Sequence, residues 1–473
     1  MALIKSIAGI RGTIGGVQGE GLTPQDIVLF TASYSTWLKE NFSGLDKLKV
    51  VVGRDARISG EMVKNLVYGS LMGMGIDVID LGLSTTPTVE MAVTILQANG
   101  GIILTASHNP KQWNALKLLN SKGEFISQSD GNRILELVFN ASFNFATVDQ
   151  LGKCSSLHDF TKEHIRRIVA LPLVDVEAIR KCNFKIAVDA VNSSGGIIIP
   201  ELLKALGVND IVEVNCEPHG NFAHNPEPLP ENLKDLSNAV IESHAHLGFA
   251  VDPDVDRLAI VSETGEMFGE EYTLVAVSDY VLMNKGGNTV SNLSSTRALR
   301  DVTENHGFHY FASAVGEVNV VEMMKSQNAV IGGEGNGGII YPELHYGRDA
   351  LVGIALFLTH LAKSGKTCSA LRSQYPDYFI SKNKIELNEN INPDEILKQL
   401  KIKYKDQPIN TIDGVKIEFG KEWVHLRKSN TEPIIRIYAE SQNADSANLL
   451  AKRIIADILD VAYNVSTNHQ ITK

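Results

Sequence analysis

Strand-like apolar runs alternate with helix-like segments early in this chain, and this alternation is the feature that most constrains its fold. Each short run of branched apolar residues leads into a polar or glycine turn and then into a longer amphipathic segment. Strands and helices in this order are typical of a parallel α/β layer, because the crossover helix returns the chain to the same sheet edge. The pattern predicts strands at 48–53, 76–81 and 100–104 and helices at 60–74 and 86–96, the first of them capped by Ser59.

The alternation recurs, and the chain of 473 residues is long enough for several domains. A second round predicts strands at 184–189, 211–214 and 247–251, and a third round occupies about 257–365. From about residue 370 closely spaced strands precede a terminal helix, which indicates a smaller α+β unit. We therefore predict three α/β modules, each presenting a loop from a strand end, followed by one α+β module.

A serine stands at the carboxyl end of one predicted strand, where ligands usually bind in open α/β sheets. Ser107 lies in Thr105-Ala106-Ser107-His108-Asn109-Pro110, and Asn109-Pro110 marks a loop. Serine is a weak nucleophile, so it needs a base, a metal or a phosphoryl group to carry out chemistry. Taken alone, Ser107 is an ordinary polar loop residue. Three later stretches favour a chemical role.

Three carboxylates at alternate positions follow the strand predicted at 247–251. They belong to Asp252-Pro253-Asp254-Val255-Asp256-Arg257. In extended or gently turning backbone alternate residues face one way, so three oxygen ligands converge as a hard cation such as Mg²⁺ requires. A calcium-binding EF-hand is excluded, since Arg257 stands where that loop needs a glycine for its sharp turn. The alternative is a solvated acidic turn, whose carboxylates would repel one another.

Two further loops offer groups suited to a phosphorylated, polyhydroxy ligand. Arg427-Lys428-Ser429-Asn430-Thr431-Glu432-Pro433 concentrates cations, hydroxyls and an amide, which are the partners of a phosphate dianion. Glu334 lies among five glycines, which let a backbone approach a sugar closely. No nucleotide-binding fingerprint is present. Together the four loops indicate phosphoryl transfer to and from a phosphorylated polyhydroxy substrate.

Composition excludes several other classes of protein. A net charge of −11 disfavours a nucleic-acid binder. No apolar run reaches the roughly 18 residues of a membrane helix, and the N-terminal residues do not form a signal peptide. The four cysteines are scattered without metal-site spacing, as expected for reduced thiols in a cytoplasmic protein.

These motifs together resemble the α-D-phosphohexomutase superfamily, in that family's order and over essentially the whole chain. The matching stretches are Gly9-Ile10-Arg11-Gly12, Gly53-Arg54-Asp55-Ala56-Arg57-Ile58-Ser59-Gly60, the Ser107 loop, the Asp252 loop, Glu334-Gly335-Asn336-Gly337-Gly338 and the Arg427 loop. The resemblance implies four domains around a central cleft, three mixed α/β and the last an α+β phosphate-binding domain. We place them at 1–155, 156–256, 257–368 and 369–473, carrying the serine, metal, sugar and phosphate loops in turn.

The resemblance also implies a mechanism. Ser107 would be phosphorylated, and Mg²⁺ would be held by Asp252, Asp254, Asp256 and an oxygen on Ser107. Phosphate would move between C6 and C1 of a hexose phosphate through a hexose 1,6-bisphosphate. The remaining catalytic residues would be Arg11, His108, Lys117 and Arg257. The substrate-binding residues would be Glu334, Asn336, Arg427, Ser429, Asn430 and Thr431.

The sequence departs from the family pattern at three places. Gly338 stands where many bacterial relatives have histidine, and Ala115 replaces a common glycine. The Glu334 loop resembles archaeal-type hexomutases more than the usual bacterial phosphoglucosamine mutases. His345 is expected to be structural rather than a replacement for that histidine, and Arg348 and Asp349 are expected to form a loop ion pair.

We favour glucosamine phosphate as the substrate of a monomer or homodimer, with mannose or glucose phosphate as the alternative. A sugar phosphatase and a non-catalytic sugar-phosphate sensor are remoter alternatives. The clamp at Arg427 argues against a phosphatase, since hydrolysis needs no reorientation of the substrate.

Overall fold

The computed structural model describes residues 2–6, 9–387, 392–428 and 434–471, with side chains as far as residue 463. The chain divides into two compact units. The first unit comprises Met1–Asn284 and Asn336–Arg372, and the second comprises Lys285–Gly335 and Ser373–Lys473. The third module, expected at 257–368, therefore contributes residues to both units.

A seven-stranded mixed sheet forms the first part of the first unit. Its order is β1-β2-β6-β5-β3-β4-β7. Strands β5, β3, β4 and β7 run parallel, whereas β1, β2 and β6 pair antiparallel with their neighbours. The strands are β1 (Leu3–Ser6), β2 (Gly9–Thr13), β3 (Leu48–Arg54), β4 (Ile76–Leu83), β5 (Gly100–Leu104), β6 (Trp113–Leu119) and β7 (Cys154–Ser156).

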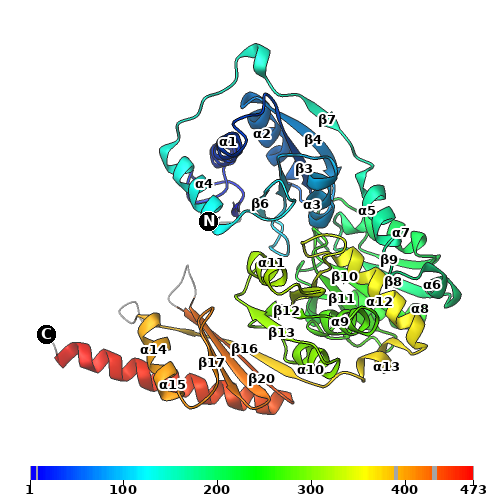
Figure 1. Cartoon of the computed structure of the whole chain (residues 1–473), viewed down its shortest axis with the longest axis vertical. Helices are drawn as coiled ribbons and strands as arrows, with labels where there is room; N and C mark the ends of the chain where they lie inside the picture. Colours follow the sequence, from blue (N-terminus) through cyan, green and yellow to red (C-terminus); the bar gives the residue numbers. More distant parts are fainter. Residues whose placement is uncertain (1, 7–8, 388–391, 429–433, 472–473) are drawn as a thin grey trace. The chain divides into compact units, whose positions relative to one another are not determined.

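Helices cover both faces of this sheet (Figure 1). Alternate residues of β3 pack against different sets of helices. Val50 and Val52 pack with helices α1, α2 and α4, whereas Val51 packs with α3 and α5 on the opposite face. Successive residues of a strand point to opposite faces, so this buried apolar run serves two cores. The helices are α1 (Pro24–Asn41), α2 (Gly60–Gly73), α3 (Thr86–Ile95), α4 (Gln128–Asn140) and α5 (Phe160–Val169).

The strands and helices predicted between residues 48 and 104 are confirmed, but the predicted cap is wrong. Ser59 has α-region backbone angles and makes no side-chain bond to the first turn of α2. Its Oγ instead accepts a 2.9 Å hydrogen bond from Asn114 Nδ2 of β6. Helix α3 has the side-chain cap that α2 lacks, since Thr85 Oγ1 accepts from the backbone N–H of Thr88.

A second sheet in the first unit has the order β11-β10-β8-β9, with β11 antiparallel to three parallel strands. Its strands are β8 (Lys185–Asp189), β9 (Asp210–Val214), β10 (Leu247–Val251) and β11 (Leu258–Ser262). The first unit also contains the short strand β15 (Gly338–Ile340), which is not part of this sheet. Helix α12 packs against α5, α6 and α9 of the same unit. The helices are α6 (Val176–Lys181), α7 (Gly195–Ala205), α8 (Lys234–Ser243), α9 (Tyr272–Asn284), α12 (Ala350–Ser364) and α13 (Cys368–Arg372), with 3-10 turns at Val148–Gln150 and Pro230–Asn232.

The second unit contains three parallel strands, β12 (Thr289–Asn292), β13 (Tyr310–Ser313) and β14 (Ile331–Glu334), with helices α10 (Ala298–Asn305) and α11 (Glu317–Ser326). The strand predicted at 329–331 is observed at Ile331–Glu334 instead. Glu334 is its buried last residue rather than part of an open loop.

An antiparallel sheet of order β16-β20-β19-β18-β17 follows in the second unit, as the α+β prediction requires. Its core is made by helices α14 and α15 packing their apolar residues on β18, β19 and β20. The elements are β16 (Phe379–Glu386), α14 (Pro393–Lys403), β17 (Ile409–Asn410), β18 (Val415–Phe419), β19 (Glu422–Lys428), β20 (Ile434–Ser441) and α15 (Ala444–Ile471). No helix in the described part of the chain is long and apolar enough to cross a membrane.

Candidate active site

Ser107 lies in a buried, strained loop just beyond the end of β5. Its φ of 48° is in the left-handed region, which non-glycine residues seldom adopt, and its exposed fraction is 7%. Thr105 Oγ1 accepts a 2.9 Å hydrogen bond from the Ser107 N–H and donates a 2.7 Å bond to Asp55 Oδ2. Side chains around the loop therefore fix the backbone that carries the serine hydroxyl.

Arg57 holds the rest of this loop through its guanidinium. Its Nε donates a 2.9 Å bond to Asp55 Oδ2, which orients the planar group. Nη1 donates to the carbonyls of Pro110 at 2.9 Å and Trp113 at 3.0 Å, and Nη2 donates to the carbonyl of Ser107. A strained backbone conformation persists only where its surroundings over-determine it, and this buried fork provides that support.

The three aspartates after β10 converge as predicted, but for a different reason. Their ligand oxygens lie within 4.8 Å of one another, and all three residues are fully buried. The backbone between them turns instead of extending, with Val255 at a φ of 63°. Asp252 Oδ1 accepts hydrogen bonds from the N–H groups of Asp256 at 3.1 Å and Arg257 at 3.2 Å, which closes the turn.

Ser107 and the aspartate turn form one polar network. Ser107 Oγ donates a 2.6 Å hydrogen bond to Asp252 Oδ2. Thr86 at the start of α3 donates from Oγ1 to Asp254 Oδ2 at 2.6 Å and from its N–H to the Asp254 carbonyl at 2.9 Å. The carboxyl end of β5 thus meets the turn after β10, although the two segments belong to different sheets.

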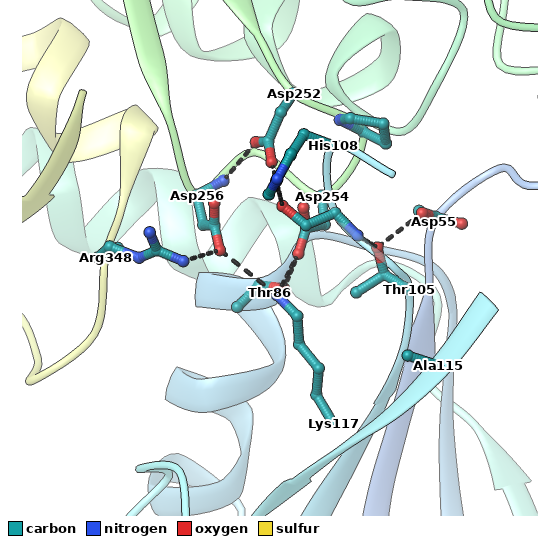
Figure 2. A network of polar contacts seen from close by, with 12 residues as sticks. Asp55, Thr86, Thr105, His108, Ala115, Lys117, Asp252, Asp254, Asp256 and Arg348 are labelled. Atoms are coloured by element: carbon teal, nitrogen blue, oxygen red, sulfur yellow. Dashed lines mark hydrogen bonds and ion pairs between the residues drawn. The ribbon is translucent and has the colours of Figure 1, made fainter. Parts of the chain in front are cut away.

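Three cations face the three carboxylates. Lys117 Nζ lies 2.7 Å from Asp254 Oδ2 and 3.4 Å from Asp256 Oδ2. Arg348 Nη2 lies 2.7 Å from Asp256 Oδ2 (Figure 2), and Arg257 Nε lies 3.9 Å from Asp256 Oδ1. The formal charges of these six side chains cancel. The charge of about −2 that a phosphoserine adds would be cancelled by one divalent cation.

The expected Arg348–Asp349 ion pair is wrong. Arg348 pairs with Asp256, while Asp349 caps α12 through hydrogen bonds to the N–H groups of Leu351 and Val352. The two adjacent side chains diverge because α12 begins directly after Asp349. Neither Arg348 nor Thr86 was predicted to join the aspartates. Only the Thr86-Pro87 helix start was visible in the sequence.

The charges in this network shift the pKa values of its members in opposite directions. Burial and the carboxylates of Asp256 and Asp254 raise the pKa of Asp252 well above its ordinary value. Burial alone would raise the pKa of Asp254, but the neighbouring Lys117 ammonium lowers it. Burial would lower the pKa of Lys117, but Asp254 and Asp256 raise it, so Lys117 keeps its proton.

The aspartate turn fits a hard divalent cation. Asp254 Oδ1 and Asp256 Oδ1 are buried, and neither has a hydrogen-bond partner among the described residues. A buried carboxylate oxygen without a partner is costly, and a cation would satisfy both. The serine oxygen, 2.6 Å from Asp252 Oδ2, is close enough to share that ion, since neighbouring Mg²⁺ ligands lie roughly 2.9 Å apart.

The other predicted residues of the first unit differ in their proximity to Ser107. His108 Nδ1 lies 3.3 Å from Ser107 Oγ, and burial together with the nearby Arg257 lowers the pKa of His108 to about 3. Arg11 is exposed on β2, opposite Ala115 of β6. Within the described ranges no hydrogen bond or ion pair joins Arg11 to Ser107 or the aspartates. Asn336 Oδ1 accepts a 3.3 Å bond from the Gly338 N–H.

The second unit contains the remaining predicted residues. Glu334 Oε1 accepts hydrogen bonds from Asn292 Nδ2 at 2.8 Å and the Gly316 N–H at 3.1 Å. Arg427 Nε lies 2.9 Å from Asp413 Oδ2, at a cavity of about 430 Å³ that is also lined by Lys398, Lys401 and Lys428. Asp394 and Asp413 line the same cavity and pair with Lys428 and Arg427, so its side chains carry an excess of positive charge but are not all cations. The predicted residues Ser429, Asn430 and Thr431 lie outside the described part of the chain.

In comparison with known proteins, the sequence matches the four domains of one protein family in order. The sequence matches the family models of the α/β/α domains I, II and III of phosphoglucomutase/phosphomannomutase at residues 4–145, 162–265 and 269–378. The model of the C-terminal domain matches residues 384–457.

Relatives match along nearly the whole chain. A phosphoglucomutase/phosphomannomutase of Thermococcus kodakarensis is 36% identical over 441 residues, which cover 92% of this chain and 95% of the relative. A phosphoglucosamine/phosphogalactosamine mutase of Sulfurisphaera tokodaii is 33% identical, over 94% of this chain and 97% of the relative. The fold matches the crystal structure of a phosphoglucomutase/phosphomannomutase family protein from Burkholderia thailandensis with a TM-score of 0.84, 24% identity and 97% coverage of each chain. The chain therefore belongs to the phosphoglucomutase/phosphomannomutase family of the α-D-phosphohexomutase superfamily, and it is an isomerase that transfers phosphate within a hexose phosphate.

Proposed function

We propose that this mutase interconverts glucosamine 6-phosphate and glucosamine 1-phosphate through phosphorylated Ser107. The observation that carries the serine assignment is the 2.6 Å contact between Ser107 Oγ and Asp252 Oδ2, in a loop that Arg57 holds in place. The two buried carboxylate oxygens without partners support Mg²⁺ at Asp252, Asp254, Asp256 and the serine oxygen. Bound there, Mg²⁺ would offset the charge on the transferring phosphoryl group.

In the first step a free hydroxyl of the sugar phosphate attacks the phosphorus of phosphorylated Ser107. The bond between phosphorus and Ser107 Oγ breaks, the proton of the attacking hydroxyl passes to Ser107 Oγ, and the product is a hexose 1,6-bisphosphate. In the second step Ser107 Oγ attacks the other phosphate of that intermediate. This regenerates the phosphoserine, passes the serine proton to the leaving sugar oxygen and releases the isomerised monophosphate. The phosphate count is unchanged over the cycle, as a mutase requires.

The protonation states of Lys117 and His108 decide which supporting role each side chain can take. Lys117, whose pKa is raised by its two carboxylate partners, is suited to stabilise negative charge and unsuited to accept a proton. His108 is neutral because its pKa is about 3, so its Nδ1, 3.3 Å from Ser107 Oγ, can hydrogen-bond the serine oxygen but is too weakly basic to take its proton at neutral pH. Arg257 and Arg348 supply the remaining positive charge beside the aspartates.

Binding of the sugar is assigned by the family resemblance. Glu334 and Asn336 contact sugar hydroxyls, and Arg11 contacts substrate near the reacting end. Arg427, Ser429, Asn430 and Thr431 grip the phosphate that does not react. The three lysines that line the Arg427 cavity support this assignment, since they add positive charge beside that residue.

The choice of sugar rests on the relatives and carries a second candidate. A relative that is 33% identical is named for glucosamine and galactosamine phosphates, whereas one that is 36% identical is named for glucose and mannose phosphates. Mutase activity on mannose or glucose phosphate is therefore the second candidate function. A distantly similar fungal N-acetylphosphoglucosamine mutase was crystallised with GlcNAc-6P and magnesium.

Two measurements test this proposal. The first incubates the enzyme with Mg²⁺ and hexose 1,6-bisphosphate labelled in its phosphates, and locates the label by peptide mapping. We expect label on Ser107, none in Ser107→Ala, and full labelling in the control Ser70→Ala, whose hydroxyl bonds within α2. Label on another residue would refute the serine assignment.

The second measurement compares kcat/KM for glucosamine, mannose and glucose phosphates in one coupled assay. A preference for glucosamine phosphate of at least tenfold, about 1.4 kcal/mol in transition-state binding, is expected. Comparable rates on the other two sugars would favour the second candidate. Release of inorganic phosphate without isomerisation would identify a phosphatase.

A further inference from the structure

Two histidines and an aspartate converge in the first unit, away from the serine and its three aspartates. His164 lies on α5, His345 lies between β15 and α12, and Asp349 caps α12. His164 Nε2 is 3.0 Å from Asp349 Oδ2, and His345 Nε2 is 3.3 Å from the same oxygen. Candidate ligand atoms of all three residues lie within 4.8 Å of one another.

The partners of these side chains orient them toward a common point. Asp349 Oδ1 accepts the hydrogen bonds that cap α12, so Oδ2 is left to face the two imidazoles. His164 Nδ1 lies 2.9 Å from Thr88 Oγ1 of α3, which directs Nε2 toward Asp349. A metal-binding histidine usually has its other ring nitrogen fixed in this way.

His345 has a matching partner on its far side. Its Nδ1 lies 3.5 Å from Glu90 Oε2 and has no hydrogen-bond partner among the described residues. With a cation on Nε2, the proton of His345 would reside on Nδ1 and point at the buried Glu90 carboxylate. Gly347 makes room for that carboxylate, because a Cβ there would lie 1.9 Å from Glu90 Oε2.

We propose that His164, His345 and Asp349 form a second divalent-cation site, selective for a borderline ion such as Zn²⁺. Two imidazole nitrogens and one carboxylate oxygen suit Zn²⁺, whereas Mg²⁺ prefers oxygen ligands alone. Ligands of a tetrahedral Zn²⁺ ion at 2.0–2.1 Å lie roughly 3.3 Å apart, close to the 3.0 and 3.3 Å observed around Asp349 Oδ2. Water would complete the coordination.

An ion in this site would strengthen a junction that already supports the aspartate turn. It would link α5 to the start of α12, and through Thr88 and Glu90 it would reach α3. Thr86 of α3 bonds Asp254, and Arg348, next to Asp349, bonds Asp256. The site is therefore a stabilising one, and the three ligands take no part in phosphoryl transfer.

The decisive experiment uses Co²⁺ as a spectroscopic substitute for Zn²⁺, added to the full-length enzyme in excess Mg²⁺ so that the aspartate turn is saturated. Tetrahedral Co²⁺ with imidazole ligands absorbs strongly in the visible range, whereas octahedral Co²⁺ with oxygen ligands absorbs weakly. We expect intense bands at one equivalent of Co²⁺, and loss of these bands on addition of Zn²⁺. His345→Gln should abolish the bands, whereas the control His360→Gln, a buried histidine of α12 near Asp279, should retain them.

Thermal unfolding provides a second readout that does not depend on the spectrum. The Tm of the wild-type enzyme should rise with the logarithm of Zn²⁺ concentration, and that of His345→Gln should not. Weak octahedral absorption together with an unchanged Tm would overturn the proposal, as would equal responses in wild type and His345→Gln. Neither measurement uses turnover, so failure of the proposed mutase mechanism would leave this result intact. His345 is partly exposed, which makes its replacement safer for folding than that of the fully buried His164.

Discussion

The guanidinium of Arg348 donates a 2.7 Å hydrogen bond to Oδ2 of Asp256, 92 residues earlier in the chain. This contact places a fixed positive charge on the carboxylate turn where we propose that Mg²⁺ binds. It also accounts for a departure from the family pattern. A Cβ at Gly338 would lie 2.4 Å from Arg348 Cδ, so any larger side chain at position 338 would displace Arg348 from this position.

Replacing Arg348 with glutamine should raise the affinity for Mg²⁺ but lower kcat. Loss of the charge beside Asp256 leaves the aspartates more negative, so half-maximal activity should need less Mg²⁺. Charge on the transferring phosphoryl group would be less well offset, and kcat should fall on the order of tenfold to a hundredfold. A Mg²⁺ titration of initial rates measures both effects. Arg133→Gln, which removes a surface ion pair with Glu40, is the control and should change neither.

Gly338→Ala should disturb the same contact between Arg348 and Asp256. The added methyl group meets the Arg348 side chain, which must then move away from Asp256. We therefore expect Gly338→Ala to shift the Mg²⁺ dependence in the same direction as Arg348→Gln, and the double variant to show little further change. Additive effects of the two substitutions would show that Gly338 acts independently of Arg348.

Arg57→Lys tests whether the guanidinium fork positions Ser107. Lysine retains the charge beside Asp55 but cannot bond the three loop carbonyls at once. We expect the rate of Ser107 phosphorylation by hexose bisphosphate to fall at least tenfold while KM changes little. The loop retains all its reactive groups in this variant, but the Ser107 hydroxyl is no longer held in position. The control is Arg133→Lys, whose ion pair with Glu40 is on the surface. A change confined to KM would assign Arg57 to substrate binding instead.

Glu440→Gln tests a pH dependence of stability in the second unit. Burial raises the pKa of Glu440 from 4.5 to about 7, despite donors from Trp423 Nε1 at 2.5 Å and the Arg297 N–H at 2.9 Å. Because the folded-state pKa is the higher one, this contribution to stability is complete below about pH 4.5. It is lost as the pH rises through about 7. Above the folded-state pKa the loss is on the order of 3 kcal/mol.

Denaturant unfolding between pH 4.5 and 8, followed by tryptophan fluorescence, measures this effect, since Trp423 is the one tryptophan in the sequence of the second unit. The wild type should lose stability as the pH rises, and Glu440→Gln should show a flatter profile. Glu418→Gln, at a half-exposed ion pair with Arg300, should retain the slope of the wild type. Identical slopes in the wild type and Glu440→Gln would show that Glu440 is ionised in the folded state across this range.

Much of the fold and the convergence of the aspartates could be predicted from the sequence, because both follow from local patterns. Apolar runs set the strands, and a carboxylate triplet at a strand end set the candidate metal site. The positions of Arg348 and Thr86 could not be predicted, since each meets the aspartate turn from a distant segment. Val255 and Ser107 have positive φ values that nothing in their own residue types favours. Their conformations are imposed by tertiary contacts, which local periodicity does not encode.

The 145 residues between Ser107 and Asp252 have a consequence for biosynthesis. At about 5–20 residues per second, a ribosome needs roughly 7 to 29 s to extend the chain from the serine to its carboxylate partner. During that interval the nascent first domain carries the serine without the acidic turn that we propose binds Mg²⁺. Phosphoryl transfer therefore cannot begin on a partly made chain, and the order of translation itself delays activity until the second sheet has emerged.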